Sequence, residues 1–141
     1  MRNLIISTVL FSLMTFTLIP TMVQAEKKVS PINVGGAVTV DAKQAKSLFD
    51  RGVVFVDVRN DKDYTAGRIP DAVHIELKKA FNKDSLGKHA KPTDVVVFYC
   101  NGHSCLRSSR AAEQAVSWGY SRVHYFRDGF PAWKSAGYPV E

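Results

Sequence analysis

Two cysteines, five positions apart, mark the part of the chain whose residues are best suited to carry out a reaction. They lie in the segment Cys100-Asn101-Gly102-His103-Ser104-Cys105-Leu106-Arg107, which follows the apolar run Val95–Tyr99. The residues after Arg107 are typical of a helix, so the segment is expected to join a buried strand to a helix. Such a loop directs several backbone N–H groups into one concavity, and the helix dipole adds positive potential there. The pattern therefore predicts an anion-binding loop that contains a thiol.

A thiol in this environment is expected to have a lowered pKa. A change from about 8.5 to about 6.5 raises the thiolate fraction at pH 7 from about 3% to about 75%. The thiolate is a nucleophile, and the loop N–H groups would hold an anionic substrate or a negatively charged sulfur adduct. We predict Cys100 as the nucleophile because it ends the strand, with Arg107 as a cation at the rim and Gly102 allowing close backbone approach. The remaining candidates for substrate contact are Asn101, His103, Ser104 and Leu106 in the loop and Arg59 just past another strand.

The residues alone leave three other interpretations of this loop open. Cys100 could be an inert thiol at the end of an apolar strand. Cys100 and Cys105 could form a structural disulfide, provided that the loop curls enough to bring their Cα atoms within roughly 7 Å. Cys100, His103 and Cys105 could ligate a metal ion, although no partner motif supplies a fourth ligand. We expect neither a metal nor a cofactor.

The elements that position this loop alternate between strands and helices. Apolar, β-branched runs predict strands at residues 38–40, 53–56, 73–75, 95–99 and 123–126. Helices are expected at residues 42–49, 62–66, 107–118 and 131–135, with residues 77–86 helical in part. This alternation predicts an α/β fold with a mostly parallel sheet flanked by helices on both faces. Ligands of such sheets bind beyond the carboxyl ends of the strands, which is where Cys100 falls.

Length and charge narrow the class of protein further. The chain has 141 residues, 45% of them hydrophobic, and a formal net charge of +6. This length supports a single domain. Lysines and arginines are scattered among acidic residues, so the charge predicts a solvated surface that attracts small anions rather than a nucleic-acid partner.

The first residues are typical of a secretory signal peptide. Met1 and Arg2 precede an apolar stretch over residues 4–19, and Val23-Gln24-Ala25 provides a small-residue exit with cleavage expected after Ala25. A retained membrane anchor is the alternative, but the stretch is short and rich in Ser and Thr for a span of about 20 residues. The expected organisation is a signal peptide at 1–25, a loose polar lead-in at 26–37 and one domain at 38–141. The mature protein would then be periplasmic or secreted, without stable membrane association, in a compartment that favours disulfides.

Four motifs in order resemble the rhodanese-like sulfurtransferase domain. Asp57-Val58-Arg59 resembles the Asp-Val-Arg signature of that family, and Gly67-Arg68-Ile69-Pro70-Asp71-Ala72 resembles its Gly-His-Ile-Pro-Gly-Ala segment. Residues 95–107 resemble its active-site strand and loop. Residues 127–133 and 136–140 resemble its closing Gly-Gly, Trp and Gly-Pro-Val pattern. The resemblance implies a five-stranded parallel sheet and a cysteine that carries a persulfide.

The resemblance implies a sulfurtransferase that moves sulfane sulfur from a donor such as thiosulfate to a thiol or cyanide acceptor. The loop departs from the family pattern, because residues 101–106 make it two residues longer than the common single-domain loop and one longer than that of related phosphatases. It also contains the additional Cys105, which we expect to act second, either by resolving the adduct or by protecting Cys100 as a reversible disulfide. A thiolate phosphatase and an inactive binding module with a Cys100–Cys105 disulfide are the alternative functions.

A structural role is the favoured interpretation for Asp57, Arg59 and His74, although Arg59 is also a candidate for substrate contact. Asp57 and Arg59 are expected to form a buried ion pair that fixes the loops. His74 is expected to be hydrogen-bonded rather than to act as a general base.

Overall fold

The computed structural model describes residues 26–141, so the expected signal peptide at 1–25 lies outside the described residues. Five strands form one sheet in the order β1-β5-β4-β2-β3, and every pair of neighbours is parallel. The strands are β1 (Ala37–Thr39), β2 (Val54–Asp57), β3 (Val73–His74), β4 (Val95–Tyr99) and β5 (Arg122–Phe126). The parallel α/β fold expected from the sequence is confirmed.

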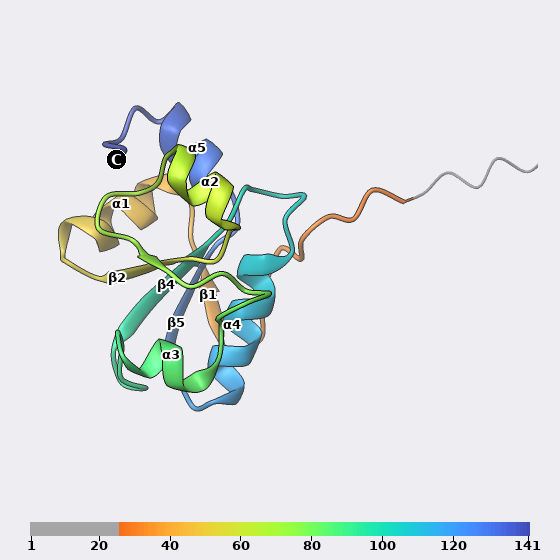
Figure 1. Cartoon of the computed structure of the whole chain (residues 1–141), viewed down its shortest axis with the longest axis vertical. Helices are drawn as coiled ribbons and strands as arrows, with labels where there is room; N and C mark the ends of the chain where they lie inside the picture. Colours follow the sequence, from red (N-terminus) through yellow and green to blue (C-terminus); the bar gives the residue numbers. More distant parts are fainter. Residues whose placement is uncertain (1–25) are drawn as a thin grey trace, which may run out of the picture.

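Helices cover both faces of the sheet (Figure 1). The helices are α1 (Ala42–Asp50), α2 (Asp61–Ala66), α3 (Lys83–Gly87), α4 (Arg107–Ser117) and α5 (Gly129–Ser135). Buried residues of α3 and α4 pack on one face, and those of α1 and α5 pack on the other. The apolar runs in β2 and β4 reflect this arrangement, because strands covered on both faces bury every side chain.

The central strand β4 sets the direction in which Cys100 points. Val96, Phe98 and Cys100 belong to the core cluster with α4, whereas Val97 and Tyr99 belong to the cluster with α1 and α5. Successive side chains of a strand point to opposite faces, and Cys100 continues this alternation one residue past the strand. The Cys100 side chain therefore lies on the α4 face of the sheet.

Local polar contacts explain where the helices begin. Asp41 and Gln44 form a capping box at the start of α1, and Asn60 caps α2 by accepting from the Asp63 N–H. The region 77–86 is helical only from Lys83, because Asn82 and Ser85 form a second capping box there. The last helix begins at Gly129 rather than at residue 131.

The lead-in before β1 is docked from Ser30 onward, so the expectation of a loose arm is wrong for this part. The Ser30 N–H donates to the carbonyl of His103 at 2.6 Å, and the Tyr125 hydroxyl donates to the carbonyl of Pro31 at 3.0 Å. Val34 is buried in the core. These contacts use backbone groups and one apolar side chain, which the polar composition of the segment conceals. In Figure 1 the orange segment passes beside the first turn of α4.

The described part of the chain contains no helix that could span a membrane. Within residues 26–141, every helix is too short or too polar to cross a bilayer.

Candidate active site

The site is built around Cys100 at the carboxyl end of β4. Cys100 is 0% exposed, and its carbonyl accepts a hydrogen bond from the Phe130 N–H at 2.9 Å. The side chain lies in the same core cluster as Ala111 and Ala112 of α4. The strand therefore places the sulfur between the end of the sheet and the first turns of the helix that follows.

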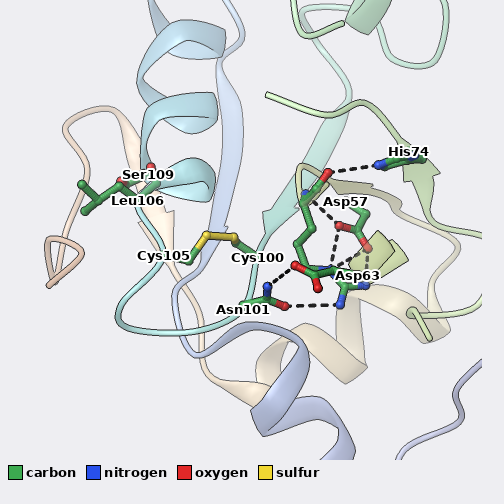
Figure 2. The surroundings of a disulfide bond; sticks show 9 residues. Asp57, Asp63, His74, Cys100, Asn101, Cys105, Leu106 and Ser109 are labelled. Atoms are coloured by element: carbon green, nitrogen blue, oxygen red, sulfur yellow. Dashed lines mark hydrogen bonds and ion pairs between the residues drawn. A yellow bond between two sulfur atoms is a disulfide. The ribbon is translucent and has the colours of Figure 1, made fainter. Parts of the chain in front are cut away.

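Cys100 is joined to Cys105 by a disulfide bond (Figure 2). The loop between them curls so that the two Cα atoms are 6.3 Å apart, and the Cys105 N–H donates to the Gly102 carbonyl at 2.9 Å. Gly102 has a φ of 94°, a value that favours glycine, and this allows the tight turn. Of the alternatives that the sequence left open, the structure shows the disulfide and not an inert free thiol.

The disulfide also prevents Cys100 from carrying a persulfide. The Cys105 sulfur is bonded where the outer sulfur of a Cys100 persulfide would be bonded. A sulfur donor therefore has no free thiol to meet until the disulfide is opened. Among residues 26–141, no group of three or more His, Cys, Asp and Glu side chains is arranged to hold a metal ion.

The loop and the start of α4 present unpaired backbone N–H groups. Leu106 is the N-cap of α4 and provides no side-chain cap. The N–H groups of residues 101–104 and 106–109 have no backbone acceptor among the described residues. Ser108, on the face of α4 that packs on the sheet, has a buried hydroxyl without a partner in the described part of the chain. Unpaired donors at a helix N-terminus favour an anion or a thiolate.

Arg107 is the first residue of α4, as the sequence analysis expected. It is half-buried, and its guanidinium forms no ion pair with another residue in the range 26–141. Its charge is therefore not neutralised by an ion pair within the described residues, and its backbone stands at the start of α4.

His103 is exposed at the rim of the loop and contacts both the residue before α5 and the N-terminal lead-in. Its Nε2 lies 2.5 Å from Oδ1 of Asp128, and its carbonyl accepts from Ser30. A hollow of about 420 Å³ opens beside this pair, lined by loop residues and by the start of α5. Its lining residues are Asn101, Gly102, His103, Asp128, Pro131, Ala132 and Ser135.

Asn101 is exposed and links the loop to the segment after β2 and to helix α2 (Figure 2). Its Oδ1 accepts from Arg59 at 3.3 Å, and its Nδ2 donates to Asp63 at 2.7 Å. Arg59 is 2% exposed and donates from Nη2 to Asp57 at 2.6 Å and to the Gly67 carbonyl at 2.7 Å. The expected buried ion pair is confirmed, and Arg59 acts on the loop through Asn101.

The surroundings of Arg59 and Tyr99 keep both side chains protonated. Burial opposes the charge of Arg59, but the hydrogen bond and the charge of Asp57 outweigh it and raise the pKa of the guanidinium. Burial, with the nearby Asp57 carboxylate, also raises the pKa of Tyr99, so its phenol remains protonated and donates to Asp57 at 2.7 Å. His74, as expected, is hydrogen-bonded, through Nε2 to the Arg59 carbonyl at 3.0 Å.

Gly129 supports the loop from the side of α5. Its φ is 62°, and a Cβ there would lie 2.9 Å from the Gly102 nitrogen and 3.0 Å from the carbonyl carbon of Cys100, with the Cys100 oxygen closer still. These atoms are backbone and cannot swing away. Only glycine lets the segment before α5 approach the end of β4 this closely.

The structure brings Arg59 to the loop through Asn101, and it adds four partners of the loop that the sequence did not indicate. Ser30, Asp63, Asp128 and Gly129 hold the loop, and none was expected to do so. For Asp128 and Gly129 the available signal was the motif at residues 127–133, which served above only for the family resemblance. Ser104 is exposed at the surface of the loop. Leu106 is half-buried and is the N-cap residue of α4.

The fold and the site define a small α/β domain with a cysteine-bearing loop between a central parallel strand and a helix. The family model of the rhodanese-like domain matches residues 41–136. This chain belongs to the rhodanese-like domain family.

Individual relatives agree with this assignment. The chain is 32% identical over 102 residues to the thiosulfate sulfurtransferase GlpE of Pseudomonas savastanoi pv. phaseolicola, covering 72% of this chain and 91% of the relative. The rhodanese-like domain of Alr3790 from Anabaena is 25% identical with a TM-score of 0.63, covering 73% of this chain and 77% of that structure. A Rhodopseudomonas palustris protein described as a possible tyrosine phosphatase is 33% identical with a TM-score of 0.60, covering 74% and 85%. Family membership supports sulfurtransferase-type activity at the level of the family.

Proposed function

We propose that the reduced protein is a sulfurtransferase that takes sulfane sulfur from an anionic donor such as thiosulfate. The Cys100 thiolate attacks the outer sulfur of the donor, the S–S bond of the donor breaks, and sulfite leaves with the bonding electron pair. The Cys100 persulfide then passes its outer sulfur to a thiol or cyanide acceptor. The sulfur is carried on the protein, so no cofactor takes part.

The observation that carries this proposal is the position of Cys100. It ends a central strand beside a helix start whose N–H groups are unpaired within residues 26–141, and those groups favour both the thiolate and an anionic adduct. Arg107 adds positive charge at the same place, which favours a donor such as thiosulfate. The relation to GlpE supports the same donor class.

Cys105 acts second in this proposal. In the reduced protein its thiolate attacks the inner sulfur of the Cys100 persulfide, the persulfide bond breaks, hydrosulfide leaves, and the disulfide forms. The Cα separation of 6.3 Å in the disulfide places Cys105 within reach of Cys100 without rearrangement of the strand.

Mass spectrometry of the reduced protein after incubation with thiosulfate tests the proposal. We expect release of one sulfite from wild type and from Cys105→Ser, and none from Cys100→Ser. Wild type should gain one sulfur atom only transiently and then form the disulfide with loss of hydrosulfide. The Cys105→Ser adduct should persist, because no second thiol resolves it. If Cys105→Ser abolishes the adduct and Cys100→Ser retains it, the two roles are reversed.

The disulfide itself favours a second candidate, a binding module without activity. In that case the bond would be structural, and native protein treated with reductant would not gain thiols that react near neutral pH. A phosphatase is less well supported, because the loop is longer than in related phosphatases and no separate acid is evident. Release of phosphate from an aryl phosphate by wild type, lost in Cys100→Ser, would favour it.

Export is proposed on the N-terminal segment alone. We propose that the mature protein begins at Glu26 in the periplasm or outside the cell, where its partners are small sulfur compounds and thiols rather than nucleic acid. The N-terminal sequence of the protein from the exported fraction tests this proposal. A full-length chain in that fraction would overturn it.

A further inference from the structure

The two cysteines of the disulfide differ in how far they are buried. Cys100 is 0% exposed within the core cluster, whereas Cys105 is half-buried in a loop whose preceding residues, His103 and Ser104, are exposed. An attacking thiolate approaches one sulfur in line with the S–S bond, from the side opposite the other sulfur. Attack on Cys100 therefore requires a path through the packed interior. Cys105 is the only one of the two cysteines that is partly exposed to solvent.

The leaving group favours the same direction of attack. When Cys105 is attacked, Cys100 leaves as a thiolate on the α4 face, where the first-turn N–H groups and the buried Ser108 hydroxyl have no partner in the described chain. A thiolate that is stabilised by such donors leaves faster. Access and leaving-group stability thus both favour attack on Cys105 with Cys100 as the leaving group.

We propose that a dithiol reductant is a second substrate of this site and that it attacks the sulfur of Cys105. Its first thiolate forms a mixed disulfide with Cys105 and expels the Cys100 thiolate. The second thiol of the reductant loses a proton and attacks the first sulfur of the reductant, which is bonded to Cys105 in the mixed disulfide. This attack expels the Cys105 thiolate, which takes up a proton. Two electrons pass from the reductant to the cysteine pair, and the reductant leaves as an internal disulfide. The inference rests on the proposed function only for the later use of the freed Cys100 thiolate.

The short distance between the cysteines explains why a dithiol is required. After the first exchange, the Cys100 thiolate is still close to Cys105, because the short loop joins two residues whose Cα atoms are 6.3 Å apart in the closed form. It can attack Cys105 again and expel the incoming thiol. A monothiol must wait for a second encounter with another thiol, whereas a dithiol resolves the mixed disulfide within one molecule.

Partial reduction of the native oxidised protein with 2-mercaptoethanol tests the position of attack. The reaction is stopped with acid, free thiols are alkylated in denaturant, and fragment masses locate the mixed disulfide and the alkyl group. We expect the mixed disulfide on Cys105 and the alkyl group on Cys100, in at least about tenfold excess over the reverse pattern. Equal amounts, or an excess on Cys100, would overturn the inference.

Two further measurements test the need for a dithiol. The mixed disulfide of Cys105 with 2-mercaptoethanol should persist in Cys100→Ser and be lost by re-closure in wild type after excess monothiol is removed. Dithiothreitol should open the native disulfide at least about tenfold faster than 2-mercaptoethanol at equal thiolate concentration. Equal lifetimes of the mixed disulfide, or a native disulfide that resists dithiothreitol, would contradict the proposal.

These readouts do not depend on sulfur transfer. Protein that is opened at Cys105 but takes up no sulfur from thiosulfate would preserve this inference and overturn the proposed function. Protein that takes up sulfur after denaturing reduction and refolding, but whose native disulfide opens at Cys100, would do the opposite.

Discussion

Replacement of Gly129 by alanine should disturb the site through the backbone alone. The new Cβ would lie 2.9 Å from the Gly102 nitrogen and 3.0 Å from the Cys100 carbonyl carbon, and closer to the Cys100 oxygen. The oxygen of Cys100 also accepts from the Phe130 N–H at 2.9 Å, so relief of the clash weakens this hydrogen bond. We expect Gly129→Ala to move the carboxyl end of β4 away from α5 and to displace Cys100.

The expected loss of stability has two parts. Alanine at a φ of 62° costs about 1–2 kcal/mol relative to glycine. Overpacking against immobile backbone costs a further amount of about 1–3 kcal/mol. The free energy of unfolding should therefore fall by about 2–5 kcal/mol.

Gly52→Ala is a matched control for this prediction. Gly52 has a φ of 74°, and a Cβ there would meet nothing within 4 Å, so only the backbone part of about 1–2 kcal/mol applies. Urea unfolding of both variants with the disulfide intact isolates the clash, and sulfur loading after reduction reports on Cys100. If Gly129→Ala is no less stable than Gly52→Ala and loads sulfur like wild type, the assigned role of Gly129 is wrong.

Three further predictions concern charged and titratable groups. Arg107→Ala should raise KM for thiosulfate by about twofold to fivefold while changing the free energy of unfolding by less than about 0.5 kcal/mol; a large stability loss with normal kinetics would indicate a structural role. Asp57→Asn leaves the buried Arg59 guanidinium without its counter-charge and should cost about 3–5 kcal/mol in urea unfolding; a loss below about 1 kcal/mol would show that the pair is dispensable. Burial, together with the positive charges of Arg122 and Arg51, lowers the pKa of His124 from its ordinary value of 6.5. The unfolded chain therefore binds the proton at a higher pH than the folded chain does. Stability should therefore decline from about pH 6.5 downward to the folded pKa, less steeply in His124→Asn; identical pH profiles would remove His124 as the cause.

The pattern of apolar runs predicted the fold because burial on both faces leaves a local trace. Residues 95–99 are uninterrupted apolar residues, and the strand found there, Val95–Tyr99, has the predicted bounds. The capping residues Asp41 and Asn60 also act within a few positions of themselves. Strands and helix starts that depend on such short-range patterns were predicted within a few residues.

The N-terminal lead-in shows where local patterns fail. Ser30 binds the cysteine-bearing loop and Arg127 through backbone atoms, and every residue type carries those atoms. Nothing in a polar segment with Pro and Gly indicates which of its carbonyls will be used. The docking of this segment could therefore be seen only in the folded chain.

The sequence by itself determined the parallel α/β architecture, the position of Cys100 at a strand end and the presence of a second thiol within five residues. These properties follow from side-chain type and spacing along the chain. Only the tertiary structure decided that the loop curls enough to join Cys100 to Cys105, that Arg59 acts through Asn101, and that Gly129 presses against the Cys100 backbone. Each of these contacts depends on the backbone path of a loop or on the close approach of segments distant in the sequence, and residue type alone does not specify either.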